Sequence, residues 1–338
     1  MTKAFHTLIL AAGKGTRMNS ELPKVVHNII DKPMAAYVIE AAKACGSDEI
    51  TLITGYKSEI VRKSLGETNL KYVTQSPQLG TGHAVQCYAN HLKELKASFP
   101  ETLLVLCGDT PLISRETINS MIKIHKEEKP AVTMMTLEMQ DPGLYGRVIR
   151  KNGTIEYIRE AKDCTQEELA VKEVNMAVYL FDGKFLEENI FKLKSANKQN
   201  EFYLTDLIEM AREKELQVLS VIEKDEESTL GINTRAHLAQ VAKIINKKNI
   251  ARHMEAGVTI TMPEQTLIGS DVIIGKDTTV MPGSLLTGQT SIGERCLIGP
   301  FASLHNCSLQ DDLKAEFVKA ENISFNESPE PFSAFGRQ

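Results

Sequence analysis

Short apolar runs alternate with amphipathic stretches through the first part of the chain, and this alternation predicts an α/β domain. Strands are predicted at 8–10, 49–54, 72–74 and 103–107, and helices at 35–45 and 58–65. The run at 103–107 is almost entirely apolar, as in a strand that is buried on both faces. We therefore expect a mostly parallel sheet covered by helices.

Residues 131–230 are predicted to add a second layer to the same domain. The dipeptide Asn152-Gly153 favours a type I′ turn between strands at 145–149 and 154–160. Further strands are predicted at 131–137, 172–181 and 217–222, and helices at 185–193 and 203–214. A long helix is then predicted up to Met254, with Asn233 or Thr234 able to cap its start.

After Gly257 the apolar residues recur at every sixth position, and small or β-branched residues follow each of them four positions later. The apolar positions are Ile268, Ile274, Val280, Leu286, Ile292, Ile298 and Leu304. Such hexapeptide repeats are typical of a left-handed parallel β-helix, in which three repeats complete one coil. The phased run predicts slightly more than two coils, ending near Leu309.

These patterns divide the chain into an α/β domain at 1–229, a linker helix at 230–256, a short β-helix at 257–309 and a tail at 310–338. The tail is charged and contains Pro, Ser and Asn, which predicts partial disorder. Residues 310 to about 320 are expected to fold back and cap the open β-helix edge. So short a prism offers little interface area, which predicts a monomer or a weak homotrimer.

Composition narrows the classes of function. The chain has 338 residues and a formal net charge of -5, which argues against general nucleic-acid binding. No apolar run approaches the ~20 residues of a membrane span, so no membrane insertion is expected. The apolar run at the N-terminus is too short for a secretory signal. The six cysteines show no C-x-x-C spacing, which favours reduced thiols and a cytoplasmic location.

The stretch LILAAGKGTRM at 8–18 is the strongest candidate for chemistry. A buried strand that opens into small residues presents backbone N–H groups to an anion, and Lys14, Arg17 and Lys24 add positive charge nearby. The spacing does not fit a Walker A loop. A dinucleotide fingerprint would need glycine where Met18 stands, followed by a full helix. Together with Leu22-Pro23-Lys24, the stretch instead resembles the signature loop of the nucleotidyltransferases that act as sugar-nucleotide pyrophosphorylases, and an ordinary βα turn is the alternative.

Asp109 follows the apolar run at 103–107, at the carboxyl end of a predicted parallel strand. Ligands of open α/β sheets bind at that edge, so a carboxylate there is well placed to hold a metal ion. A capping aspartate in a turn is the alternative, and the nearby glycine loop favours the metal.

The chain resembles the bacterial GlmU family, specifically its N-acetylglucosamine-1-phosphate uridylyltransferase half. The resemblance lies in the segments LILAAGKGTRM, ELPKVVH, QSPQLGTGHAV, CGDTPLI, YGRVIR, IREAKD, EVNMAVY, EFYLTDLI and GINTRAHLAQV, followed by the hexapeptide repeats. It implies an α/β Rossmann-like nucleotidyltransferase domain followed by a short left-handed parallel β-helix.

The resemblance also implies residue roles. The uridine and phosphates would be held by Leu10, Ala11, Ala12, Gly13 and Lys24, and the uracil would be recognised by Gln75, Gly80 and Thr81. The sugar would be bound by Gly146, Glu160 and Asn175. Mg²⁺ would be ligated by Asp109 and Asn233, and the catalytic residues would be Arg17, Lys24 and Asp109.

The reaction so implied joins UTP and N-acetylglucosamine 1-phosphate into UDP-N-acetylglucosamine, a cell-envelope precursor, and releases pyrophosphate. Two departures from the family pattern stand out. Asn175-Met176-Ala177 replaces the usual N-T-G, which leaves the exact sugar open. The repeats stop before the coils that carry the acetyltransferase site, so no acetyltransferase activity is expected. The alternatives are a nucleotidyltransferase for another sugar 1-phosphate, or a non-catalytic nucleotide-sugar sensor.

Overall fold

The computed structural model describes residues 5–66 and 68–336, and the chain divides into two compact units. The N-terminal unit comprises Met1–His27 and Pro33–Thr234, and the C-terminal unit comprises Asn28–Lys32 and Arg235–Gln338.

The segment Asn28–Lys32 departs from the prediction, which placed it in the first domain. It forms a small two-stranded sheet from β2 (Asn28–Ile29) and β3 (Lys32–Pro33). The Asp31 carboxylate accepts a hydrogen bond from the Gly288 N–H at 2.6 Å, and Lys32 Nζ lies 3.1 Å from the carboxylate of Asp271. These polar contacts explain why a segment from early in the chain belongs to the C-terminal unit.

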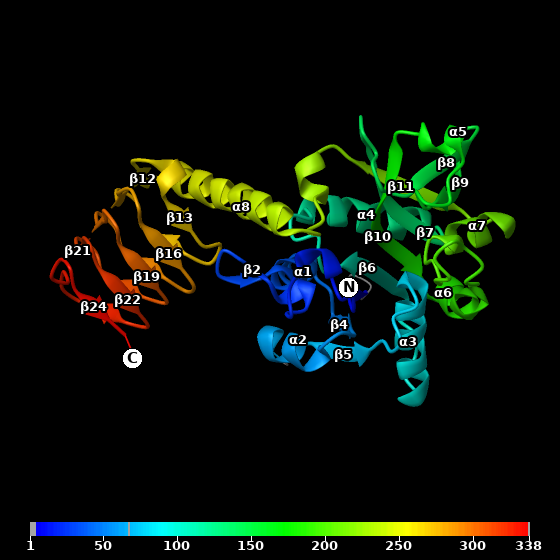
Figure 1. Cartoon of the computed structure of the whole chain (residues 1–338), viewed down its shortest axis with the longest axis horizontal. Helices are drawn as coiled ribbons and strands as arrows, with labels where there is room; N and C mark the ends of the chain where they lie inside the picture. Colours follow the sequence, from blue (N-terminus) through cyan, green and yellow to red (C-terminus); the bar gives the residue numbers. More distant parts are fainter. Residues whose placement is uncertain (1–4, 67, 337–338) are drawn as a thin grey trace. The chain divides into compact units, whose positions relative to one another are not determined.

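A nine-stranded sheet forms the centre of the N-terminal unit (Figure 1), in the order β11-β7-β10-β6-β1-β4-β5, with β8 and β9 attached through β10. The strands are β1 (His6–Ala11), β4 (Glu49–Thr54), β5 (Lys71–Thr74), β6 (Thr102–Cys107), β7 (Val132–Glu138), β8 (Arg147–Lys151), β9 (Thr154–Arg159), β10 (Glu173–Asp182) and β11 (Val218–Glu223). Because β1 is parallel to both β4 and β6, the loops that follow these strands meet at one edge of the sheet.

The helices of this unit are α1 (Met34–Ala44), α2 (Ser58–Leu65), α3 (Thr81–Glu94), α4 (Arg115–Glu128), α5 (Gln166–Leu169), α6 (Gly183–Asn189) and α7 (Asp206–Glu213). Of these, α1, α2, α6 and α7 lie where helices were predicted, whereas α4 and α5 were not predicted. The β8–β9 hairpin is also confirmed: Asn152 and Gly153 have φ angles of 51° and 82°, as a type I′ turn requires. The fold class is therefore confirmed in the N-terminal unit.

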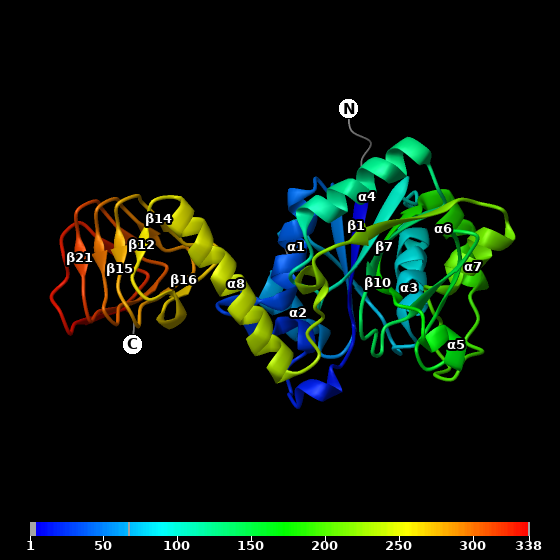
Figure 2. The same cartoon turned by 90° about the horizontal axis from the view of Figure 1, so that it is seen from above.

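The C-terminal unit consists of α8 (Arg235–Glu255), the small β2–β3 sheet and a parallel β-helix (Figure 2). Its strands form three sheets, in the orders β12-β15-β18-β21, β13-β16-β19-β22-β24 and β14-β17-β20-β23. The first coils confirm the repeat: Leu267 of β13 (Leu267–Ile268) pairs with Leu285 of β16 (Leu285–Thr287), 18 positions later. The predicted apolar positions, from Ile268 to Leu304, are buried inside the prism.

The β-helix does not end near Leu309, and the predictions for the tail were wrong. The ladder continues in parallel through β21 (Lys314–Ala315), β22 (Lys319–Glu321), β23 (Ser324–Phe325) and β24 (Ala334–Phe335). The coils shorten there: Leu297 pairs with Lys314, and Ser303 pairs with Lys319. The six-residue period is therefore lost although the coiling continues, with Ala315, Ala320 and Phe325 buried inside.

This longer prism changes two further expectations. Residues 310–320 lie in the ladder rather than folding back as a cap. The prediction of a monomer or weak homotrimer assumed little more than two coils, and that premise no longer holds.

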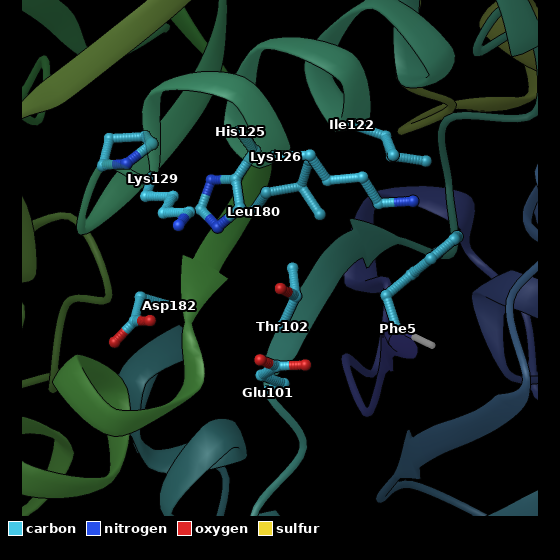
Figure 3. Close-up of a pocket in the computed structure, with 10 residues that line it drawn as sticks. Phe5, Glu101, Thr102, Ile122, His125, Lys126, Lys129, Leu180 and Asp182 are labelled. Atoms are coloured by element: carbon cyan, nitrogen blue, oxygen red, sulfur yellow. The ribbon is translucent and has the colours of Figure 1, made fainter. Parts of the chain in front are cut away.

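A cavity of about 420 Å³ lies at the edge of the sheet where β6 begins, away from the loops that follow β1 and β6 (Figure 3). It is lined by Phe5, Glu101, Thr102, Ile122, His125, Lys126, Lys129, Pro130, Leu180 and Asp182. None of the predicted site residues lies here. Its buried histidine, His125, bonds through Nδ1 to the Thr133 hydroxyl at 2.9 Å.

We expect His125 to make the N-terminal unit less stable in mild acid. Burial lowers the pKa of His125 from 6.5 to about 4, although the nearby Asp182 carboxylate partly opposes this shift. The unfolded chain takes up a proton below pH ~6.5, but the folded chain does not until about pH 4, so stability falls across that window. The expected loss is about 2 kcal/mol by pH 4.5.

Urea unfolding at pH 7 and pH 4.5 measures this loss. In His125→Gln the decrease in the free energy of unfolding between pH 7 and pH 4.5 should be smaller by about 2 kcal/mol. His91→Gln is the matched control, because it removes a histidine that is only half-buried, on α3. Equal pH dependence in wild type and His125→Gln would contradict the prediction.

Candidate active site

The loop after β1 packs tightly against Lys24. Gly15 has a φ of 66°, and a Cβ at this position would lie 2.6 Å from Lys24 Cβ. Only glycine combines this backbone conformation with such a close approach. The short 3₁₀ turns Thr16–Met18 and Lys24–Val26 then bring Arg17 and Lys24 to the same edge of the sheet.

Four of the predicted residues converge at this edge, although they are far apart in sequence. The ammonium of Lys24 is in direct contact with the Asp109 carboxylate and lies 3.3 Å from Asn233 Oδ1. The guanidinium of Arg17 donates to the same Asn233 oxygen at 2.9 Å. The backbone holds the pair together, because the Ile232 N–H donates to the Asp109 carbonyl at 2.8 Å.

This arrangement fits a small divalent cation. One carboxylate oxygen, of Asp109, and one amide oxygen, of Asn233, already face the ammonium of Lys24, and the Asn233 oxygen also faces the guanidinium of Arg17. Mg²⁺ prefers such oxygen ligands and usually adds waters and substrate phosphates to one or two protein groups. Among the described residues no cluster of three or more His, Cys, Asp or Glu side chains could hold a metal ion by itself. A metal ion bound to Asp109 and Asn233 would take waters or phosphate oxygens as its further ligands.

A cavity of about 300 Å³ opens beside this cluster. It is lined by Leu10, Ala11, Ala12, Gly13, Lys24, Val25, Gln75, Gln78, Gly80, Thr81, Ala84, Cys107, Asp109 and Glu201. Every residue predicted to bind the nucleotide lies in its wall. Gln78, Cys107 and Glu201 were not among the predicted site residues, although all three fall inside segments that carry the family resemblance.

At one end of the cavity, the loop between β5 and α3 is held rigidly. Gly80 has a φ of 100°, and a Cβ there would lie 2.7 Å from the Phe202 carbonyl oxygen. The Thr81 hydroxyl oxygen accepts from the Leu204 N–H at 3.1 Å. Gln75 is buried, and its amide nitrogen donates to the Gly80 carbonyl at 2.9 Å. Polar groups with fixed directions therefore line this end of the cavity.

The predicted sugar-binding residues form a neighbouring group. The Asn175 N–H donates to the Gly146 carbonyl at 2.9 Å, and a Cβ on Gly146 would lie 3.5 Å from both Glu160 carboxylate oxygens. Burial raises the pKa of Glu160, although a hydrogen bond from Thr205 opposes the shift. Gly146, Glu160 and Asn175 do not line the 300 Å³ cavity, but the Cys107 thiol, which does, lies 3.8 Å from the Ala177 carbonyl oxygen.

The departure at 175–177 places alanine at a left-handed position of the backbone. Ala177 has a φ of 54°, a left-handed conformation that glycine adopts without strain and alanine does not. The Asn175 side-chain oxygen accepts from the Ala177 N–H at 3.1 Å and supports this turn, where the β7–β10 register shifts. The Met176 side chain is buried. Ala177 therefore takes, with strain, a backbone conformation that glycine would take freely at this position.

Comparison with known proteins finds a matching family and similar sequences. Residues 7–168 match the family of MobA-like NTP transferase domains. The chain is 43% identical over 328 residues to the bifunctional protein GlmU of Fervidobacterium nodosum, covering 96% of this chain and 70% of that protein. It is 41% identical to the bifunctional protein GlmU of Clostridium botulinum, covering 96% of this chain and 71% of that protein.

Among solved structures, a UDP-glucose pyrophosphorylase complexed with UDP-glucose matches with a TM-score of 0.58. The match covers 73% of this chain and 99% of that chain at 19% sequence identity, so it shows the shared fold alone. In the part of the chain that the structure describes, no helix has the length and apolar character needed to cross a membrane.

Proposed function

Because the chain belongs to the family of bifunctional GlmU proteins, we propose that its N-terminal unit is a Mg²⁺-dependent uridylyltransferase. It would convert UTP and N-acetylglucosamine 1-phosphate into UDP-N-acetylglucosamine and pyrophosphate. The observation that carries this proposal is the convergence of Arg17, Lys24, Asp109 and Asn233 at the mouth of the cavity. A cation-rich site beside a pocket with directed polar groups suits a nucleoside triphosphate.

The nucleotide would lie along the loop 10–13, with its base toward Gln75, Gly80 and Thr81. Uracil has one N–H donor between two carbonyl acceptors, and an amide oxygen together with backbone N–H groups can match that pattern. The sugar phosphate would bind at Gly146, Glu160 and Asn175, where a carboxylate and an amide can bond its hydroxyl groups.

The chain's own residues suit a direct displacement at the α-phosphorus. An oxygen of the sugar phosphate would form the new P–O bond while the bond to the departing pyrophosphate breaks. Arg17 and Lys24 would balance the charge on the phosphates, and Asp109 with Asn233 would hold Mg²⁺, which neutralises phosphate charge when bound. Cys107 is unsuited as a nucleophile, because burial and the nearby Asp109 raise the pKa of its thiol to about 12.

The six cysteines are free thiols, which supports the proposal of a cytoplasmic location. The rival assignment, a nucleotide-sugar sensor, would need the binding cavity but not the full set of Arg17, Lys24, Asp109 and Asn233. Because the turn at Ala177 is strained, a sugar 1-phosphate other than N-acetylglucosamine 1-phosphate is the alternative substrate.

Pyrophosphate release across a panel of nucleoside triphosphates and sugar 1-phosphates tests the proposal. We expect UTP with N-acetylglucosamine 1-phosphate to give the highest kcat/KM, and chelation of divalent metal to abolish the reaction. A higher kcat/KM with another sugar 1-phosphate would correct the substrate. Tight binding of UDP-N-acetylglucosamine without any turnover would favour the sensor instead.

A further inference from the structure

The side chain of Gln75 is held by two acceptors that together determine which of its atoms faces the cavity. Its Nε2 donates to the Gly80 carbonyl at 2.9 Å, and the same nitrogen lies 3.2 Å from His83 Nδ1. A primary amide nitrogen carries two hydrogens, so these contacts use both. The oxygen Oε1 is then the polar atom of Gln75 that remains to meet a ligand in the cavity, which Gln75 lines.

His83 can accept this bond only in one tautomer. An amide nitrogen does not accept hydrogen bonds, so Nδ1 must carry the lone pair and Nε2 the hydrogen. The Nε2 atom lies 3.7 Å from the Cys87 sulfur, one helical turn further along α3. Burial lowers the pKa of His83, partly offset by the carbonyl of Pro77, which favours the neutral ring near pH 7.

We propose that His83 is a positioning residue for base selection: it holds the Gln75 amide with its oxygen toward the cavity. This inference rests on the proposed function and deepens it. An oxygen at that point attracts a base with a ring N–H, such as uracil at N3. Cytosine has a lone pair at N3, so it would place two acceptors against each other and leave both without a partner.

The choice between uracil and cytosine therefore depends on how firmly the amide is held. If the amide rotated by half a turn, its NH₂ group would face the cavity and could donate to N3 of cytosine. Rotation would set Oε1 against the Gly80 carbonyl and against His83 Nδ1, which is also an acceptor in the tautomer that carries its hydrogen on Nε2. Removing the His83 acceptor leaves only Gly80 to oppose the rotation, so discrimination weakens without disappearing.

A matched pair of variants separates the hydrogen bond from the packing of the ring. His83→Asn keeps an acceptor close to the position of Nδ1, and His83→Leu has nearly the shape of asparagine without any acceptor. The measured quantity is the inhibition constant of CTP divided by the KM of UTP, which requires no turnover of CTP. We expect His83→Leu to lower this ratio about fivefold to tenfold, and His83→Asn to stay within about twofold of wild type.

Cys87→Ala is the control, because it removes the other polar neighbour of His83 but not the bond to Gln75. It should leave the ratio unchanged. Thermal unfolding checks that the variants remain folded. An unchanged ratio in His83→Leu, or equal losses of UTP and CTP affinity, would show that His83 acts only through packing and would overturn the inference. A wild-type protein that does not react with UTP would instead refute the proposed function.

Discussion

Asp109→Ala is expected to lower kcat by roughly 10²–10³-fold, since it removes the only carboxylate of the proposed metal site. In the structure this carboxylate is in direct contact with Lys24, and its backbone carbonyl positions the loop that carries Asn233. The substitution leaves the backbone bond intact, so the fold and the Asn233 position should persist. The loss should therefore appear in turnover rather than in stability.

Pyrophosphate release at saturating substrates, with Mg²⁺ titrated, measures both consequences. Asp109→Ala should also require more Mg²⁺ for half-maximal activity. Asp109→Asn keeps one side-chain oxygen, so its Mg²⁺ requirement should lie between those of wild type and Asp109→Ala. Asp48→Ala is the matched control, because Asp48 is an exposed carboxylate just before β4, at the opposite end of the sheet. Full turnover in Asp109→Ala at the wild-type Mg²⁺ concentration would remove Asp109 from the mechanism.

Lys24→Met should lower kcat by about 10³-fold, because a fixed positive charge near the departing pyrophosphate acts mainly in the transition state. The Lys24 side chain is only 15% exposed, and its ammonium lies between Asp109 and Asn233. A charge held in so little water is screened weakly, so its removal has a large effect. Lys24→Arg keeps the charge but not the compact shape and should recover part of the rate.

Lys14→Met provides the comparison on the same loop. Lys14 is exposed, and its Nζ lies 5.4 Å from the centre of the Tyr56 ring, so it contributes charge without reaching the cluster. We expect Lys14→Met to change kcat by less than about threefold at physiological salt. Similar losses of kcat in Lys14→Met and Lys24→Met would indicate that the total positive charge of the loop matters, and not the position of Lys24.

Local patterns in the sequence were sufficient for most strands and several helices of the N-terminal unit and for the class of each unit. The strand at 49–54 and the helix at 58–65 have the predicted bounds, because alternation, helical spacing and a terminal glycine act over a few residues. The six-residue period likewise predicts the first coils of the β-helix, since each repeat packs on its immediate neighbours. The prediction that the loop at 8–18 binds phosphate likewise rests on its own small residues and charges.

The extent of the β-helix was decided only by the tertiary structure. Once a ladder of backbone hydrogen bonds exists, the next coil can lose a residue at a corner and still pair, as Ser303 does with Lys319. The periodicity then fails although the architecture continues. The attachment of Asn28–Lys32 to the C-terminal unit was also decided only by the tertiary structure, because it depends on the hydrogen bond between the Asp31 carboxylate and the Gly288 N–H.

The candidate site was also predicted only in part from the sequence. The residue types and their places at strand ends were visible in the sequence, and the family resemblance supplied the expected roles. The contact of Lys24 with both Asp109 and Asn233, and the holding of the Gln75 amide by Gly80 and His83, were not visible. Hydrogen bonds between distant residues depend on distances and directions that only the folded chain sets, whereas periodicity and turn preference are properties of short segments.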